Sequence, residues 1–218
     1  MLIPVVPRVV KSLIPKLIWS IPVTGHEVFI TFDDGPIPEV TPGVLELLDR
    51  YNAKATFFCV GDNVRKYPEV YQKVLDGGHA VGNHTFHHLH GATHDVPQYV
   101  EDVQFASTYI DSPLFRPPYG FIRPLQQKAL NKFYRIIMWS VMTYDYRQDL
   151  SWEDCYELAI RKTPPGSIIV FHDSLKSQER MFPALEKFLQ WGTEQNLSFA
   201  AIDASALIKK DEYIYSGH

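Results

Sequence analysis

The sequence predicts an α/β protein whose parallel sheet closes, or nearly closes, into a barrel. Short apolar runs alternate with amphipathic segments along almost the whole chain, which is typical of βαβ units. About seven or eight of these runs are candidate strands, a number that suits a barrel better than a flat sheet. Polar side chains follow several of the runs, where a barrel of this kind carries its functional residues.

The individual elements follow from hydrophobic periodicity and from helix-start signals. Ser151 is expected to cap the helix 152–162, and Thr41, followed by Pro42, is the candidate N-cap of the helix 44–51. The predicted strands are 28–32, 55–60, 79–82, 114–115, 134–141, 167–171 and 199–202. The predicted helices are 44–51, 63–76, 99–110, 124–132, 152–162 and 181–195.

The chain is expected to form one domain, residues 23–218, preceded by an arm, residues 1–22, that packs on it. Its 218 residues are 45% apolar and 21% charged, which is ordinary for a globular protein. Prolines interrupt the arm, so no apolar run approaches the ~20 residues that span a bilayer, and no cleavage site follows an apolar core. No transmembrane segment is expected, and attachment to a membrane surface is the weaker alternative. The expected contacts of the arm are Leu13, Ile14, Leu17 and Trp19.

Charge and cysteine content narrow the classes of partner and fold. The formal net charge is −4 and no basic patch stands out, so nucleic acid is not an expected partner. The two cysteines, Cys59 and Cys155, lie far apart and do not form a disulfide framework. They therefore say little about the compartment.

Two adjacent carboxylates, Asp33 and Asp34, follow the first predicted strand and precede a Gly-Pro turn. Carboxylates in such a place repel each other and lose hydration, which raises the pKa of at least one of them. A fold tolerates this when a cation lies between them or when one carboxylate acts as a base. The alternative is that Asp33-Asp34-Gly35 is only a solvated turn.

Two histidines four residues apart, His84 and His88, form the second candidate motif. One helical turn would put both imidazoles on the same face, a common way to hold a transition metal. With one carboxylate of the Asp33-Asp34 pair they would form a two-histidine, one-aspartate metal site. The alternative is a polar loop that is merely rich in histidine.

Further polar residues follow other predicted strands and should lie on the same rim. Arg116 follows the strand 114–115, Asp145 follows 134–141, and His172 follows 167–171. The carboxyl ends of parallel barrel strands meet at one face, where active sites are built. A guanidinium there would lower the pKa of a paired carboxylate and fix its orientation.

These motifs resemble, in order and spacing, those of the polysaccharide deacetylase family, also described as the NodB homology domain and carbohydrate esterase family four. The likeness runs from about Glu27 to Ile202, nearly the whole chain. The motifs are 31–36, His84-Thr85-x-x-His88, Arg116-x-Pro118-Tyr119, and a strand followed by His172-Asp173.

The resemblance implies a distorted (β/α) barrel of about seven parallel strands and a divalent metal. Zinc is the usual ion, with Co²⁺, Ni²⁺ or Mn²⁺ as alternatives. Carried onto this sequence, the metal ligands match Asp34, His84 and His88.

The resemblance also implies catalytic roles for other residues. Asp33 matches the general base, Arg116 the residue that orients it, and His172 the general acid. Pro118 and Tyr119 match substrate-contacting positions, and the Tyr119 N–H matches a donor to the oxyanion.

The chain departs from the family pattern after the fifth predicted strand. Family members often carry an acid there that supports the catalytic histidine, and Met142 stands in its place. Either Asp145 supports His172 instead, or no acid does. Tyr146 and Val170 occupy the aromatic and aliphatic positions expected to line the pocket for the acetyl methyl.

The expected function is metal-dependent removal of N-acetyl groups from an N-acetylglucosamine-containing polysaccharide, either peptidoglycan or a chitin-like oligomer. Hydrolysis of small amides or ureides on the same fold, and non-catalytic carbohydrate binding, are the alternatives. The expected partner is therefore a carbohydrate polymer or oligomer. The compartment, cytoplasmic or envelope-associated, stays open.

Overall fold

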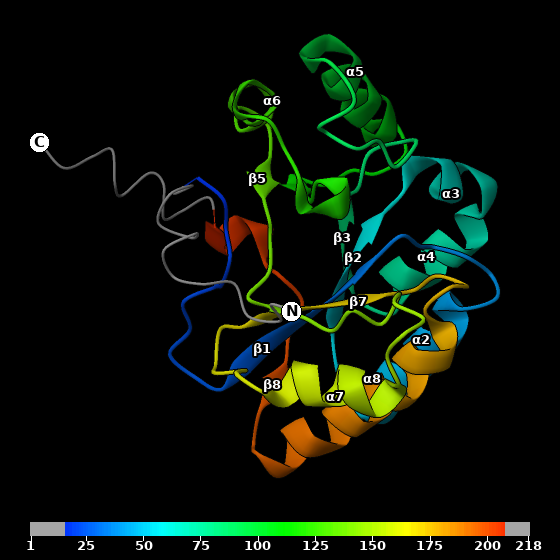
Figure 1. Cartoon of the computed structure of the whole chain (residues 1–218), viewed down its shortest axis with the longest axis vertical. Coiled ribbons are helices and arrows are strands. Elements are labelled where there is room, and N and C mark those ends of the chain that lie inside the picture. Colours follow the sequence, from blue (N-terminus) through cyan, green and yellow to red (C-terminus); the bar gives the residue numbers. More distant parts are fainter. Residues whose placement is uncertain (1–15, 208–218) are drawn as a thin grey trace, which may run out of the picture.

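A curled sheet of parallel strands forms the centre of the protein (Figure 1). The computed structural model describes residues 16–207. The strands run in the order β5-β4-β3-β2-β1-β7-β6, and β8 also pairs with β1. The prediction of an α/β fold with about seven parallel strands is confirmed. The strands are β1 (Glu27–Asp33), β2 (Ala55–Cys59), β3 (Ala80–Asn83), β4 (Leu114–Phe115), β5 (Arg135–Ile136), β6 (Val141–Met142), β7 (Ile168–His172) and β8 (Ser198–Phe199).

The sheet is a half-barrel, because β5 and β6 lie at opposite ends of the strand order. Its central strands are buried on both faces, which explains why β1 and β7 are nearly continuous apolar runs. The Phe32 ring stacks on Phe57 at 4.9 Å and on Phe171 at 6.1 Å, joining the three central strands. This packing fixes the ends of the strands that carry the polar residues.

Helices follow most strands and cover the outside of the sheet. Figure 1 shows α2, α7 and α8 together along one side, with α5 and α6 at the opposite end. The helices are α2 (Thr41–Arg50), α3 (Gly61–Lys66), α4 (Pro68–Asp76), α5 (Val96–Ser107), α6 (Pro124–Leu130), α7 (Trp152–Ile160) and α8 (Gln178–Glu194). A short 3₁₀ turn, η1 (Pro118–Gly120), follows β4.

Two helix predictions were wrong in detail. The single helix predicted over 63–76 is two helices, α3 and α4, because Pro68 has no N–H to continue the first one. The N-cap of α2 is Val40, not Thr41. The Thr41 hydroxyl instead donates to the Asp173 carboxylate at 2.7 Å, so tertiary contact replaced the local cap.

The strand predicted over 134–141 was also wrong, because this segment contributes to both edges of the sheet. β5 pairs with β4 at one edge, and β6 pairs with β7 at the other. Between them the chain changes partners: Ile137 N donates to Phe115 O, and Ser140 N donates to Ile168 O. No helix lies between β5 and β6, so the residues 137–140 link the two edges directly.

The described part of the arm, residues 16–22, packs beside the segment 137–140 that links the two edges of the sheet. Ile18 N donates to Ile136 O at 2.9 Å, and Ile21 N donates to Gly166 O at 2.9 Å. Leu17 is buried, and Trp19 packs against the same apolar cluster. The other predicted contacts, Leu13 and Ile14, lie outside the described residues. Within 16–207, no helix combines the length and apolarity that crossing a bilayer requires.

The predicted cap of α7 is present, and it gives a test of this part of the fold. The Ser151 hydroxyl accepts from Asp154 N at 3.1 Å, and the Asp154 carboxylate accepts from Ser151 N at 2.9 Å. Ser151→Ala should lower the free energy of unfolding by about 1 kcal/mol, because both helix-end donors depend on this capping box. Urea unfolding measures the loss. Ser107→Ala, at the exposed end of α5, is the matched control, and an equal loss in both variants would contradict a capping role.

Candidate active site

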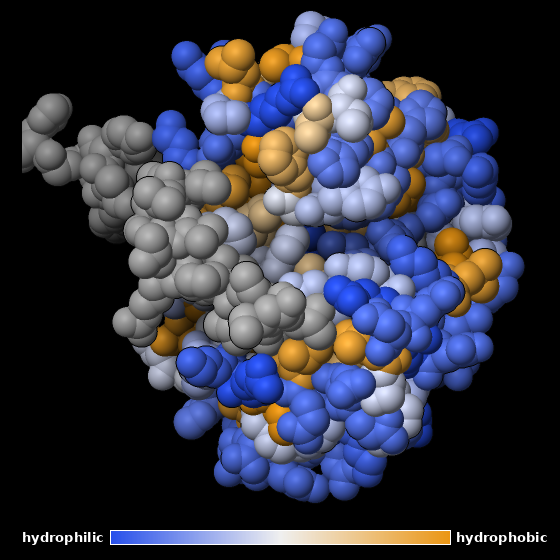
Figure 2. Space-filling view, viewed as in Figure 1, coloured by the Kyte–Doolittle hydropathy of each residue, from blue (hydrophilic) through white to orange (hydrophobic). Residues whose placement is uncertain are grey.

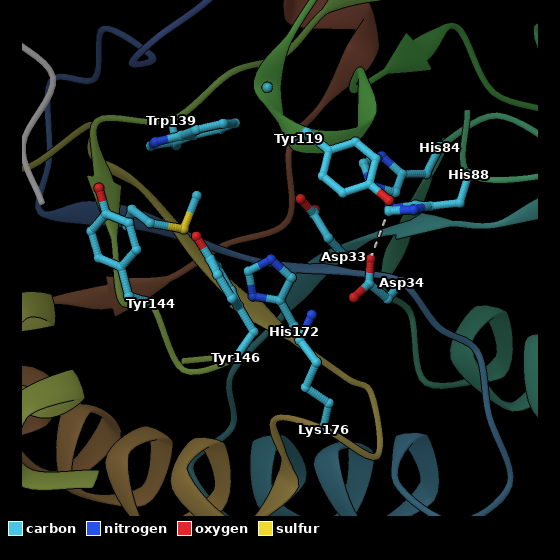
Figure 3. A pocket seen from close by; sticks show the side chains of 12 residues that line it. Asp33, Asp34, His84, His88, Tyr119, Trp139, Tyr144, Tyr146, His172 and Lys176 are labelled. Carbon is cyan, nitrogen blue, oxygen red and sulfur yellow. Dashed lines mark ion pairs between the residues drawn. The ribbon is translucent and has the colours of Figure 1, made fainter. Parts of the chain in front are cut away.

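A cavity of about 350 Å³ lies where the carboxyl ends of β1, β3 and β7 meet η1. Figure 2 shows this face of the molecule hollowed near its centre, with hydrophilic residues inside the hollow. In Figure 3 the metal-ligand candidates lie on one side of the cavity with Tyr119 beside the two histidines, and the other aromatic side chains, Trp139, Tyr144 and Tyr146, lie on the opposite side. The lining residues are Asp33, Asp34, His84, His88, Tyr119, Gly120, Trp139, Met142, Tyr144, Tyr146, His172 and Lys176.

The first charged pair of the site joins Asp33 to Arg116. Arg116 is fully buried, and its Nη1 donates to Asp33 Oδ1 at 2.6 Å and to Thr31 Oγ1 at 2.8 Å. Its Nε and Nη2 donate to the carbonyls of Ile137 and Met138, at 3.2 and 3.0 Å. Every side of the guanidinium is thus engaged, and the Asp33 carboxylate is held in one orientation.

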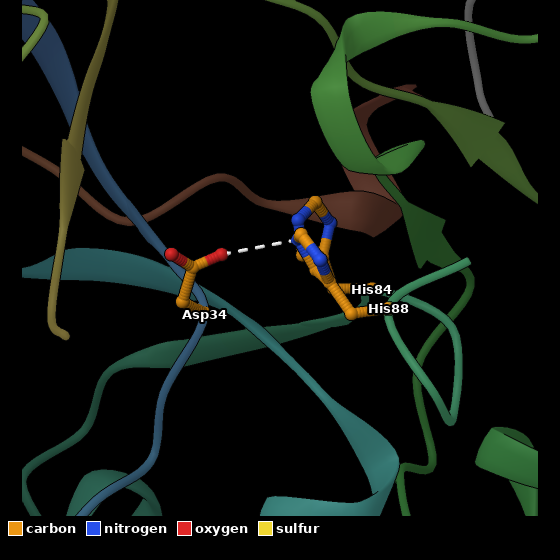
Figure 4. A group of neighbouring side chains, drawn as sticks. All are labelled: Asp34, His84 and His88. Carbon is orange, nitrogen blue, oxygen red and sulfur yellow. Dashed lines mark ion pairs between the residues drawn. The ribbon is translucent and has the colours of Figure 1, made fainter. Parts of the chain in front are cut away.

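Asp34, His84 and His88 form the group of side chains best suited to hold a metal ion in the described part of the chain. One candidate ligand atom from each lies within 4.8 Å of the other two. Figure 4 shows the Asp34 carboxylate facing both imidazoles, with His88 Nε2 at 3.2 Å from its Oδ1. The three side chains therefore converge on one point, as a two-histidine, one-carboxylate metal site requires.

The electrostatics of this group fit a cation. Burial alone would raise the pKa of Asp34, but the hydrogen bond from His88 and the nearby histidines hold that pKa well below its usual range. Burial lowers the pKa of His84 to about 4, so its imidazole is neutral at pH 7. His84 Nδ1 lies 2.7 Å from Arg116 O, which leaves Nε2 as the nitrogen for a ligand. The set of ligand atoms, the negative charge of Asp34 and the tautomer of His84 all suit a divalent ion such as zinc.

The two histidines do not lie on a helical turn, so that part of the prediction was wrong. They belong to a loop after β3, in which Thr85 and His88 have positive φ of 64° and 55°. Asp102 of α5 holds the loop by accepting from Phe86 N at 2.8 Å and from His87 N at 3.1 Å. Tertiary hydrogen bonds thus replace those of a helix, and they still bring both imidazoles together.

His172 is held by Asp145, the residue whose supporting role the sequence left open. Asp145 Oδ1 lies 2.7 Å from His172 Nδ1, and its Oδ2 accepts from His172 N at 2.8 Å. Asp145 is fully buried. Burial lowers the pKa of His172, but the charge and hydrogen bond of Asp145, together with the charges of Asp34 and Asp33, outweigh burial and raise this pKa to about 9. His172 is therefore protonated at neutral pH, with its other nitrogen free of this contact.

Asp173 organises the turn that carries the two carboxylates. Its carboxylate accepts from Gly35 N at 3.0 Å and from the Thr41 hydroxyl. A Cβ added at Gly35 would lie 2.0 Å from Asp173 Oδ2, so only glycine fits there. Burial raises the pKa of Asp173 to about 7. The sequence pointed to this residue only as the neighbour of His172.

The structure divides the four predicted substrate-contacting residues into two groups. Tyr119 and Tyr146 line the cavity, and the Tyr146 ring packs edge-on against His172 at 4.9 Å. Pro118 and Val170 are buried and are not among the lining residues. Four further lining side chains were not singled out as contacts: Trp139, Met142, Tyr144 and Lys176. Of these, only Met142 carried a sequence signal, as a departure from the family pattern.

Comparison with known proteins gives the family. A sequence model described as polysaccharide deacetylase matches residues 20–134, more than half of the chain. The chain belongs to the polysaccharide deacetylase family. The resemblance inferred from the four motifs is confirmed, and the half-barrel agrees with the fold that it implied.

Individual relatives cover most of the chain. A peptidoglycan-N-acetylglucosamine deacetylase of Bacillus cereus is 32% identical over 196 residues, which cover 84% of this chain and 90% of that protein. A chitooligosaccharide deacetylase of Azorhizobium caulinodans is 35% identical over 160 residues, 70% of this chain and 76% of that protein.

Among solved structures, a peptidoglycan N-acetylglucosamine deacetylase in complex with an N-hydroxybenzamide compound superposes with a TM-score of 0.80. It is 30% identical in sequence, and the match covers 86% of this chain and 91% of that one.

Metal binding can be tested without an assay of activity. His84→Gln should weaken Zn²⁺ binding by more than the about 10–100-fold typical of losing an outer-shell partner, because it removes a direct ligand. Titration calorimetry on chelator-treated protein measures the affinity. His26→Gln is the matched control, since His26 lies before the amino end of β1, away from the site. Unchanged zinc affinity in His84→Gln would remove His84 from the ligand set.

Proposed function

We propose that the protein is a metal-dependent hydrolase that removes acetyl groups from N-acetylglucosamine units of a polysaccharide. The observation that carries this proposal is that Asp33 and His172 line the same cavity as the Asp34, His84 and His88 group (Figure 3). The named activities of the relatives, on peptidoglycan and on chitooligosaccharide, support the same substrate class.

Asp34, His84 and His88 would hold the metal ion, and zinc suits this donor set best, with Co²⁺, Ni²⁺ or Mn²⁺ as alternatives. When bound, such an ion supplies Lewis acidity, which makes a water molecule more acidic and polarises a carbonyl group.

Asp33 is the proposed base, which takes a proton from the attacking water. Arg116 binds its Oδ1 at 2.6 Å, so the second carboxylate oxygen is the one that accepts the proton. The amide carbon of the acetyl group gains the water oxygen, and its carbonyl oxygen becomes an oxyanion. The N–H of Tyr119, on the η1 turn at the cavity edge, is the proposed donor to that oxygen.

His172 is the proposed acid. As the carbon–nitrogen bond breaks, it donates its proton to the leaving amine, and acetate and a free amino sugar are formed. Its raised pKa, to which Asp145 contributes most and Asp34 and Asp33 add, keeps this proton available at neutral pH. Tyr146 packs on the His172 ring and, with Tyr119, is proposed to border the acetyl group.

A non-catalytic carbohydrate-binding protein would need neither the Asp33–Arg116 pair nor a charged His172. The ion pair between Asp33 and Arg116 and the contact between His172 and Asp145 are both present, which favours an enzyme over a binding protein. Hydrolysis of a small amide would use the same groups, so a substrate comparison has to separate it.

The function is tested by acetate release from chitotetraose and from peptidoglycan glycan strands, with a small N-acetylated amine as the comparison. Release from the sugars should stop with chelator and return with Zn²⁺ or Co²⁺. Asp33→Asn should lower kcat by about 10²–10⁴-fold, because an amide cannot accept the proton. The exposed Asp111→Asn is the control. Near-normal activity of Asp33→Asn would exclude Asp33 as base, and release from the small amide alone would exclude a polysaccharide substrate.

The role of Asp145 can be tested through pH. His172 must carry a proton to act as acid, so the rate should fall as pH rises through its pKa. Asp145→Asn removes the charge that raises this pKa, and should move both the alkaline limb of the pH–rate curve and the NMR titration of His172 to lower pH by more than about one unit. Asp149→Asn, an exposed carboxylate paired with Arg147, is the control. An unchanged alkaline limb would show that Asp145 does not tune the acid.

A further inference from the structure

A second cavity, of about 570 Å³, adjoins the catalytic cavity. Gly120 of η1 lines both, so the two cavities meet at this turn. Trp19 of the second cavity packs edge-on against Trp139 of the first, with ring centroids 6.5 Å apart. The described lining residues of the second cavity are Lys16, Leu17, Trp19, Gly120, Phe121, Ile122, Pro124, Gln127, Lys128, Asn131 and Met138.

The arm builds one wall of this second cavity, and α6 with the turn before it builds the other. The family match begins at residue 20, so Lys16, Leu17 and Trp19 lie outside the matched region. Trp19 and Phe121 give the cavity flat aromatic surface of the kind that packs against sugar rings.

Both charged residues of the lining are cations, Lys16 and Lys128, and both are exposed. No carboxylate is among the described lining residues, although the chain as a whole carries a net charge of −4. An occupant of this cavity should therefore carry negative charge.

We propose that the second cavity binds the saccharide units next to the one being deacetylated, and that it favours a glycan whose units carry carboxylates. The chemistry that fits is a lactyl ether carboxylate on alternate sugars, as in N-acetylmuramic acid, rather than the uncharged units of chitin. This inference rests on the proposed function and names its substrate class. Lys16 and Lys128 are the specificity-determining residues.

The test compares three tetrasaccharides of equal length. One alternates N-acetylglucosamine with N-acetylmuramic acid and has free lactyl carboxylates, the second is its methyl ester, and the third is chitotetraose. The wild-type chain should have a lower KM for the acid than for the ester. The double variant Lys16→Gln/Lys128→Gln should raise the KM for the acid by about threefold to tenfold, the range expected from two exposed ion pairs. Its kcat should stay unchanged, and so should its KM for the ester and for chitotetraose.

Lys132→Gln is the matched control, because Lys132 is an exposed lysine just after α6 that does not line the cavity. Raising the salt to about 0.5 M should shrink the difference between acid and ester, since exposed charges are screened. Equal KM values for acid and ester in the wild type, or an equal rise for all three sugars in the double variant, would overturn the inference.

Failure of the proposed function would be recognised separately. In that case no tetrasaccharide would release acetate, and tryptophan fluorescence would report equilibrium binding instead. Tighter binding of the acid than of the ester, lost in the double variant, would still support the second cavity as an acidic-glycan site. Equal binding of the acid and the ester would overturn it.

Discussion

The buried ion pair between Arg116 and Asp33 is the interaction on which the rest of the site depends. A fully buried guanidinium is costly unless all its donors are engaged, and here they reach β1 and the segment that crosses between the two sheet edges. Its aromatic neighbour Phe58 lies 4.1 Å below the guanidinium carbon. Arg116 also presents its carbonyl to His84, so one residue orients the proposed base and a metal-ligand candidate together.

Most of the fold was predictable because its signals are local. Buried parallel strands are continuous apolar runs, and a polar residue directly after such a run must lie at the carboxyl rim of the sheet. That argument alone brought Asp33, His84, Arg116 and His172 to one place, and the structure puts them there. The cap at Ser151 was likewise visible, because a capping box is set by residues three apart.

The rest depended on contacts between distant segments. The run 134–141 has the composition of one strand, and only its pairing with β4 on one side and β7 on the other reveals two. The spacing of His84 and His88 fits a helical turn, but Asp102, far along the chain, holds them in a loop. Whether Asp145 could reach His172 depended on the path of a loop whose φ at Tyr144 is 57°, and no period in the sequence encodes that.

The backbone around the cavity is held in a conformation that side-chain-bearing residues seldom adopt. Positive φ values occur at Asp34, Thr85, His88, Tyr119 and Tyr144, all of them in the loops that form the site. Glycine would relax each of these positions, but would remove a side chain or loosen a loop that the site uses. Selection for thermal stability and selection for catalysis therefore favour different residues at these positions. The rest of the half-barrel must be stable enough to offset the backbone strain of the site.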